Sequence, residues 1–324
     1  MRIALQMDPI ESINIDTDSS FLLGLGALER GHAVWYWNPK DLFIEASRLK
    51  ARARKLALRR EQGNHFSFLE SRTLDVADEL DVLLLRQNLP INMGYVANTL
   101  LLEHAPGHVN SQPLIINNPA GVRDTPGKIF PLRFPDLTPP TLIASSSEAI
   151  KSFAAKYGEV VGKRLFNSAG IDVFRFKSSD PALLTFAEEH YAATGEPVAV
   201  QAFLQDVFKG DKRIILFDGE PVAAINRIPA AGDFRANMAQ GAKPEICDIT
   251  AREREICAAL APHFHQRGLL FVGIDVIGGY LTEVNPGSPT GLQAVNKLYN
   301  LAGDARMEMR FWKMVEAKLK GQKS

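Results

Sequence analysis

The chain has 324 residues, of which 46% are apolar and 23% are charged, and this is the composition of an ordinary globular protein with two or three packed units. Its 37 basic and 37 acidic residues cancel, so the sequence lacks the positive charge that is typical of proteins binding nucleic acid or anionic membranes. Two cysteines do not make a disulfide framework, and no signal region or long apolar run is found, which favours a cytoplasmic enzyme acting on small molecules.

The N-terminal third alternates between apolar stretches and polar turns or helical segments. Such β-α-β alternation predicts a parallel sheet, whose ligands collect at the carboxyl ends of the strands. The expected strands span residues 1–7, 34–37, 81–85 and 114–117. A helix is expected over residues 21–30, and Asp18, Ser19 or Ser20 either caps its first turn or contacts a substrate. Arg86 follows a buried strand, where a guanidinium can hold a carboxylate through two hydrogen bonds.

A basic run occupies residues 50–60, KARARKLALRR. Alone it would suggest nucleic-acid binding, but it is isolated in a neutral chain. A solvated face of a strand or helix is therefore the better interpretation.

The middle of the chain is expected to form a small unit that offers two lysines. A helix over residues 121–134 carries Lys128, and a strand over residues 159–163 ends at Lys163. Four more segments complete this unit: a strand over 141–144, a helix over 145–157, a turn over 167–170 with a return strand over 173–176, and an apolar edge over 196–204 that suits a hinge.

The C-terminal part begins with a hairpin over residues 214–222 that turns at Asp218 and Gly219. The loop that follows, residues 228–243, is rich in alanine and glycine and is long enough to act as a lid. Arg227, Arg235 and Asn237 are assigned to this loop. An amphipathic helix is expected over residues 250–267.

The stretch FVGIDVIGGYLTEVNPGSPT, residues 271–290, predicts two strands joined by a glycine turn. A two-residue loop would pair Asp275 with Thr282, whereas a three-residue loop of Gly278, Gly279 and Tyr280 pairs it with Glu283. The three-residue loop is preferred because it places Thr282 on an apolar face and gathers Asp275, Glu283 and Asn285 on the other. Carboxylates forced together need a cation, and a rigid set of oxygen ligands suits Mg²⁺, with Mn²⁺ as the alternative. From these three residues alone, a solvated hairpin face with ordinary surface acids is an equally good interpretation.

The order of these parts resembles the ATP-grasp superfamily and, within it, the bacterial glutathione synthetases. The matching stretches include MDPIESINIDTDSSF (7–21), LLLRQNLPINM (83–93), NNPAGVRDTPGKIFPLRFPDLTPPTLI (117–143), GDKRIILFDGEPVAAINRIP (210–229), RANMAQG (235–241) and FVGIDVIGGYLTEVNPGSPTG (271–291). The resemblance implies an ATP-grasp fold behind an N-terminal parallel α/β domain. It implies domains of residues 1–118, 119–200 and 201–324, and a homo-oligomer.

The resemblance also implies the chemistry. ATP phosphorylates the cysteinyl carboxylate of γ-glutamylcysteine, and the amine of glycine then displaces phosphate. Carried over by position, the residues that meet the nucleotide are Lys128, Lys163, Asn167, Ser168, Gln201, Phe203, Leu204 and Asp211. The catalytic residues are Arg213, Arg235 and Asn237, the Mg²⁺ ligands are Asp275, Glu283 and Asn285, and the substrate residues are Asp18, Ser19, Ser20, Arg86, Ser288 and Thr290.

Three stretches depart from the family pattern. Lys163 is followed by RLFNSAG instead of a glycine-rich loop, so hydrogen bonds from Asn167 and Ser168 are expected to replace bare backbone amides. Asn88 and Asn92 stand where the substrate-side pattern has acids, and EVNPGSPT and Gly241-Ala-Lys243 also differ from it. Three hypotheses remain: glutathione synthetase itself, a related ligase with another peptide or amine, and a nucleotide-binding protein without turnover.

Overall fold

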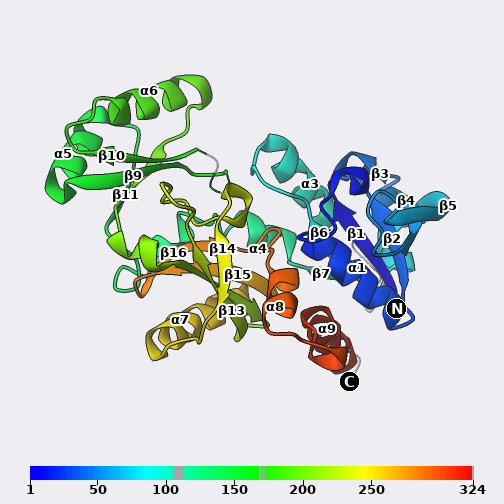
Figure 1. The fold of residues 1–324 in the computed structure, drawn as a ribbon. Coiled ribbons are helices and arrows are strands. Elements are labelled where there is room, and N and C mark those ends of the chain that lie inside the picture. Colours follow the sequence, from blue (N-terminus) through cyan, green and yellow to red (C-terminus); the bar gives the residue numbers. More distant parts are fainter. Residues whose placement is uncertain (105–112, 168–169, 171, 323–324) are drawn as a thin grey trace.

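A computed structural model describes residues 1–104, 113–167, 170 and 172–322 of the chain. Within these residues the strands form three β-sheets, each built from its own stretch of sequence (Figure 1). In that view the second sheet lies above the third, and the first lies to one side. The expected α/β architecture is thus confirmed, and the space between the second and third sheets becomes the place to look for a ligand site.

Four parallel strands form the centre of the first sheet, and an antiparallel extension continues it on one side. The strand order is β3-β4-β2-β1-β6-β7, with β5 paired to β4. The strands are β1 (Arg2–Met7), β2 (Ala33–Trp37), β3 (Leu42–Glu45), β4 (Arg48–Leu58), β5 (Phe66–Asp75), β6 (Val82–Arg86) and β7 (Leu114–Ile116). The apolar runs therefore predicted the four parallel strands correctly, because strands covered on both faces are continuously apolar.

The basic run is the solvated face of a strand, as expected. It lies on β4, where Leu49, Ala51, Ala53 and Leu56 are buried. The arginines and lysines between them are exposed or half-buried. This alternation is the period of a strand with one wet face.

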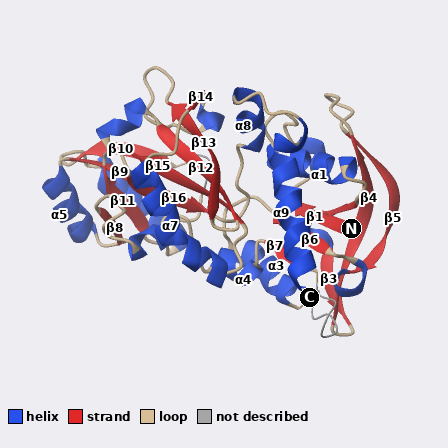
Figure 2. Ribbon diagram, turned by 90° about the horizontal axis from the view of Figure 1, so that it is seen from below, coloured by secondary structure: helices blue, strands red, loops and turns tan. Residues whose placement is uncertain are grey.

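Among the described residues, four helices accompany the first sheet: α1 (Ser19–Glu29), α2 (Val76–Glu79), α3 (Met93–Glu103) and α9 (Met307–Gln322). Of these, α1 and α9 come from opposite ends of the chain. The Asp18 carboxylate caps α1 by accepting a hydrogen bond of 2.7 Å from the Phe21 amide. The C-terminal α9 packs beside α1 (Figure 2), where Trp312 Nε1 donates to the Leu23 oxygen at 2.8 Å. The division of the chain at residues 118 and 200 stays a prediction.

The second sheet has the strand order β10-β9-β11-β8 and is antiparallel. Its strands are β8 (Thr141–Ala144), β9 (Glu159–Arg164), β10 (Val173–Lys177) and β11 (Val198–Ala202), and its helices are α5 (Ser147–Tyr157) and α6 (Ala182–Thr194). The expected apolar edge is β11, which pairs on both sides. It is a central strand of the sheet, which explains why it is apolar.

The third sheet has the order β14-β13-β12-β15-β16. Its strands are β12 (Asp211–Phe217), β13 (Glu220–Ile228), β14 (Lys243–Ile246), β15 (Phe271–Ile277) and β16 (Tyr280–Asn285), with the helices α7 (Ala251–Gln266) and α8 (Leu292–Leu298). Thr250 and Glu253 form a capping box at the start of α7.

Arg227 lies within β13, so its assignment to the lid loop was wrong. The pairing of β12 with β13 extends further along the chain than the turn signals indicated.

The helix expected over residues 121–134 was also wrong. A short helix, α4 (Pro119–Arg123), is followed by a turn and by a 3-10 segment (Phe130–Arg133). Pro126 and Pro131 interrupt the pattern, since proline lacks the amide that a helix interior needs. The turn packs on the third sheet, where the Val284 amide donates to the Gly127 oxygen at 3.0 Å. Lys128 is thereby fixed next to β16.

Candidate active site

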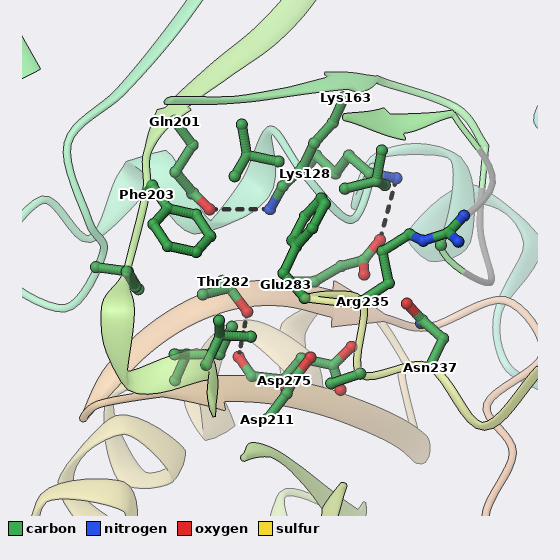
Figure 3. A pocket seen from close by; sticks show the side chains of 18 of the residues that line it. Lys128, Lys163, Gln201, Phe203, Asp211, Arg235, Asn237, Asp275, Thr282 and Glu283 are labelled. Carbon is green, nitrogen blue, oxygen red and sulfur yellow. Dashed lines mark hydrogen bonds and ion pairs between the residues drawn. The ribbon is translucent and has the colours of Figure 1, made fainter. Parts of the chain in front are cut away.

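A pocket of about 750 Å³ lies between the second and third sheets (Figure 3). It brings together eleven of the residues singled out from the sequence, namely Lys128, Lys163, Asn167, Gln201, Phe203, Leu204, Asp211, Arg235, Asn237, Asp275 and Glu283. Ser168 lies outside the described residues.

The hairpin of β15 and β16 pairs Asp275 with Glu283, as preferred from the sequence. The loop length was wrong, however, because Ile277 pairs with Tyr280 across a two-residue turn of Gly278 and Gly279. A β-bulge between Asp275 and Val276 shifts the register and restores the pairing. The bulge also turns Leu281 into the core and Thr282 into the pocket, which corrects the placement of Thr282 on the apolar face.

Asp275 is a buried carboxylate held by two buried arginines. Arg213 donates to both of its oxygens, at 2.6 Å and 3.0 Å, and Arg227 Nη2 lies 3.0 Å from Oδ1. Burial would raise the pKa of Asp275, but the two guanidiniums outweigh it and hold that pKa below its ordinary value. The carboxylate is therefore ionised and fixed in place.

Asp211 is the second carboxylate in contact with Arg227. Its Oδ1 lies 2.8 Å from Arg227 Nη2. Burial raises the pKa of Asp211 to about 6, with Arg227 opposing the shift and Asp275 adding to it. Two acids and two arginines thus form one buried network at the floor of the pocket.

Both lysines line the pocket, and each is held by different partners. Lys128 Nζ lies 3.1 Å from Glu283 Oε1 and also donates to the backbone oxygen of Asn167. Lys163 Nζ donates to Gln201 Oε1 at 2.9 Å. Burial lowers the pKa of Lys163, and the charge of Glu283 opposes this shift. An anion entering the pocket would meet both ammonium groups.

At the other end of the pocket the chain leaves β11 through Ala202, Phe203 and Leu204. The Phe203 ring packs edge-on against Phe208 and Phe234, and the Arg175 guanidinium lies 3.9 Å from its centroid. Gln201 Nε2 donates to Thr141 Oγ1 at 2.9 Å, which orients its oxygen towards Lys163. An apolar slot with backbone groups along one wall is suited to a flat heterocycle.

The loop between β13 and β14 contributes Arg235 and Asn237. Arg235 is paired with Asp233 of the same loop at 2.8 Å, and the backbone amide of Arg235 also donates to Asp233. These contacts hold the pKa of Asp233 at about 2. The loop thus presents its cation at the rim of the pocket.

A second hollow of about 1300 Å³ adjoins the first and shares Lys128, Asn167, Asn237 and Glu283 with it. It is lined by the remaining metal candidate, Asn285, and by Arg213, Ser288 and Thr290. Asp18, Ser19, Ser20 and Arg86 are not among the described residues that line it. Asp18 caps α1, Ser19 and Ser20 are buried, and Arg86 is only 4% exposed.

Comparison with known proteins agrees with this geometry. The model of the prokaryotic glutathione synthetase N-terminal domain matches residues 1–123, and that of the prokaryotic glutathione synthetase ATP-grasp domain matches residues 127–300. The chain belongs to the prokaryotic glutathione synthetase family. It is 42% identical over 320 residues to the glutathione synthetase of Mesorhizobium japonicum, covering 99% of each chain, and 43% identical over 318 residues to that of Rhodopseudomonas palustris, covering 98% of this chain and 99% of the relative.

Solved structures of other enzymes share the fold of this chain. A D-cycloserine synthetase superposes with a TM-score of 0.67 at 17% identity, covering 98% of this chain and 99% of its own. The D-alanyl-alanine synthetase A of Vibrio cholerae superposes with a TM-score of 0.61 at 14% identity, covering 98% of each chain. Both share the overall fold, and the family match identifies it as ATP-grasp.

Two functional candidates of this glutathione synthetase family member were not predicted from the sequence. Arg227 contacts both buried acids, and Thr282 donates from Oγ1 to the backbone oxygen of Asp275 at 3.1 Å. Arg227 pairs with Asp211 across the β12–β13 hairpin, but counting residues outward from the Asp218-Gly219 turn points to Asn226, because the register shifts between Ile215 and Leu216. Thr282 is likewise placed by a bulge that has no sequence mark.

Gly127 sets the position of Lys128, and this leads to a prediction. A Cβ atom at residue 127 would lie 2.4 Å from the Val284 oxygen, so Gly127→Ala must shift the backbone next to Lys128 and Glu283. We expect the KM for ATP to rise about tenfold. Gly121→Ala is the matched control. Gly121 lies a few residues before Gly127, and its Cβ would lie 2.0 Å from the backbone oxygen of Arg267, away from Lys128. An equal change of the ATP KM in both variants would contradict the prediction.

Proposed function

We propose that the protein is an ATP-dependent glutathione synthetase that joins γ-glutamylcysteine to glycine. One observation carries this proposal: a pocket with two lysines, three carboxylates and an apolar slot opens directly into a second, larger hollow. Transfer of a phosphoryl group from a nucleotide to a second substrate requires two adjoining sites of this kind.

In this proposal the first pocket holds ATP. The adenine lies in the slot formed by Gln201, Phe203 and Leu204, and the phosphates lie between Lys128 and Lys163. Support comes from the placement of both ammonium groups on the open side of the slot. Charges fixed in advance stabilise the phosphoryl group during transfer without having to reorganise. Asp211 is assigned to the ribose hydroxyls.

The metal residues of the proposal are Asp275, Glu283 and Asn285. No group of three or more His, Cys, Asp and Glu side chains suited to a metal ion is found among the described residues. Two carboxylates facing each other across paired strands, with a neighbouring amide, nevertheless provide the oxygen donors that suit Mg²⁺ or Mn²⁺. Such an ion, when bound with ATP, neutralises negative charge on the phosphates.

The second hollow holds the peptide and the amine. Asn237 lines both hollows and Arg213 lines the second. The cysteinyl carboxylate attacks the terminal phosphorus of ATP at their junction, and ADP leaves. The amine of glycine then attacks the acyl carbon of the mixed anhydride and loses a proton, and phosphate leaves. Arg213 and the rim cation Arg235 are assigned to the charge that builds up on the transferred group.

After Lys163, the described residue Asn167 lines both sites and Phe166 lines the second. The Ile91 amide donates to the Phe166 oxygen at 3.3 Å, and Asn167 Nδ2 donates to Asp172 Oδ2 at 2.6 Å. The side-chain nitrogen of Asn167 is thus occupied within its own loop, while the backbone oxygen of Asn167 accepts from Lys128. Ser168 and Ala169 lie outside the described residues, so their contribution to phosphate binding stays a prediction.

An assay of ADP release tests the proposal. With Mg²⁺, ATP, γ-glutamylcysteine and glycine, we expect ADP and glutathione in equal amounts, and little ADP when the dipeptide is left out. Release of ADP with another amine or dipeptide only would favour the altered-substrate hypothesis. ATP binding without any ligation would favour a protein that has lost turnover.

Two further properties belong to the proposal. No described helix is both long and apolar enough to span a bilayer. We infer a cytoplasmic enzyme, since ATP is its substrate, and a homo-oligomer, as the family resemblance suggested. Light scattering of the purified chain measures the oligomeric state.

A further inference from the structure

The segment of residues 286–290, here named the substrate loop, follows directly after the metal candidate Asn285. All five of its residues line the second hollow. The loop has no helical or strand structure, so its shape depends on side chains that hold it from outside. Two such side chains are found, and both come from the carboxyl ends of neighbouring strands in the first sheet.

Asn117 holds the start of the loop. This residue follows β7 and is only 2% exposed. Its Nδ2 donates to the Pro286 oxygen and to the Phe271 oxygen, both at 2.6 Å. Its Oδ1 accepts from the Leu270 and Phe271 amides at 2.8 Å and 2.9 Å. One amide therefore ties the loop to the start of β15.

Arg86 holds the end of the loop. Its Nη2 donates to the Pro289 oxygen at 2.9 Å, and its Nε donates to Ser20 Oγ at 2.9 Å. Ser288 Oγ in turn donates to the Arg86 backbone oxygen at 3.4 Å. The guanidinium also packs over the Phe271 ring, 5.3 Å from its centroid. Arg86, at the end of β6, thus connects α1 to the substrate loop.

We propose that Arg86 and Asn117 are positioning residues for the peptide and amine substrates, acting through the substrate loop. This rests on the proposed function, and it replaces the sequence-based assignment of Arg86 as a direct ligand of a substrate carboxylate. Neither residue is among those that line the hollow. By fixing the two proline carbonyl groups, they set where Ser288 and Thr290 face the substrate. The N-terminal domain thereby determines substrate affinity from outside the site.

The test compares Arg86→Met and Asn117→Ala in steady-state kinetics. Arg86→Met keeps most of the buried stem and removes every donor. We expect the KM for γ-glutamylcysteine or glycine to rise about tenfold or more in both variants, while the KM for ATP changes less than about twofold. Ser20→Ala removes only the Arg86 contact to α1, and we expect a smaller rise of the same kind.

Gln6→Met is the matched control. Gln6 lies on β1, next to β6, and accepts a buried hydrogen bond of 2.9 Å from Trp37 Nε1, which the substitution removes. Gln6 is not among the described residues that line the second hollow. We expect it to lower the unfolding midpoint without changing either KM. An effect of Arg86→Met on peptide affinity without one of Asn117→Ala would overturn the proposal in favour of direct contact. A similar KM change in Gln6→Met would overturn it in favour of general destabilisation.

The wild-type assay separates this inference from the proposed function. If the wild type does not ligate γ-glutamylcysteine and glycine, the proposed function fails. The positioning role is then measured by hydrogen exchange of peptides covering residues 285–291. Faster exchange in Ser20→Ala and Arg86→Met than in Gln6→Met supports the role, and equal exchange in all three refutes it. Ser20→Ala keeps this comparison informative if Arg86→Met does not fold.

Discussion

Glu283→Gln is expected to lower the affinity for Mg·ATP and to reduce kcat by about a hundredfold or more. The substitution keeps the shape of the side chain and removes one charge. The substitution removes the negative charge from two interactions. One is with the metal ion proposed between Asp275 and Glu283, and the other is with Lys128, whose Nζ lies 3.1 Å from the Glu283 carboxylate. Calorimetric titration with ATP, with and without Mg²⁺, measures the first loss.

Glu245→Gln is the control, because Glu245 is an exposed acid on β14 of the same sheet. It should leave both quantities unchanged. If Glu283→Gln binds Mg·ATP and turns over like the wild type, the metal assignment is wrong. If it loses affinity for ATP equally with and without Mg²⁺, the effect comes from Lys128 alone.

The hairpin of β15 and β16 shows how much of a strand register the alternation of apolar and polar residues can predict. Burying Ile274 and Val284 on one face was enough to bring Asp275 opposite Glu283. The route to that register was not predictable, because the extra residue of the bulge, Thr282, carries no turn or glycine signal. The same bulge decides that Thr282 faces the pocket and Leu281 does not.

The residues of the proposed nucleotide site were predictable for a different reason. Lys163, Gln201 and Asp211 stand on three strands of two sheets, so their assignment rested on the family resemblance and not on strand position. Arg86 stands at the end of a parallel strand, yet it is buried by the substrate loop and by Phe271, which come from about 200 residues further along the chain. Contacts of that separation leave no mark in local composition.

Arg227→Met is expected to cost the protein about 3–5 kcal/mol of unfolding free energy. Arg227 is 3% exposed, and its Nη2 lies 2.8 Å from Asp211 and 3.0 Å from Asp275. Its removal leaves the Asp211 carboxylate buried without an ion-pair partner among the described residues, while Asp275 keeps Arg213. An uncompensated buried charge accounts for most of the loss. Urea unfolding followed by circular dichroism measures it.

Two further variants show whether burial is the cause. Arg227→Lys keeps the charge but not the two-pronged geometry, so we expect it to recover part of the lost stability. Arg235→Met removes the same kind of group from a pair with Asp233 that is 35% and 22% exposed, and it should change the stability by less than about 1 kcal/mol. Equal losses in Arg227→Met and Arg235→Met would show that the buried network contributes no more than a surface ion pair. A large loss confined to Arg227→Met would mean that the buried network next to the proposed ATP pocket also helps to hold the third sheet together.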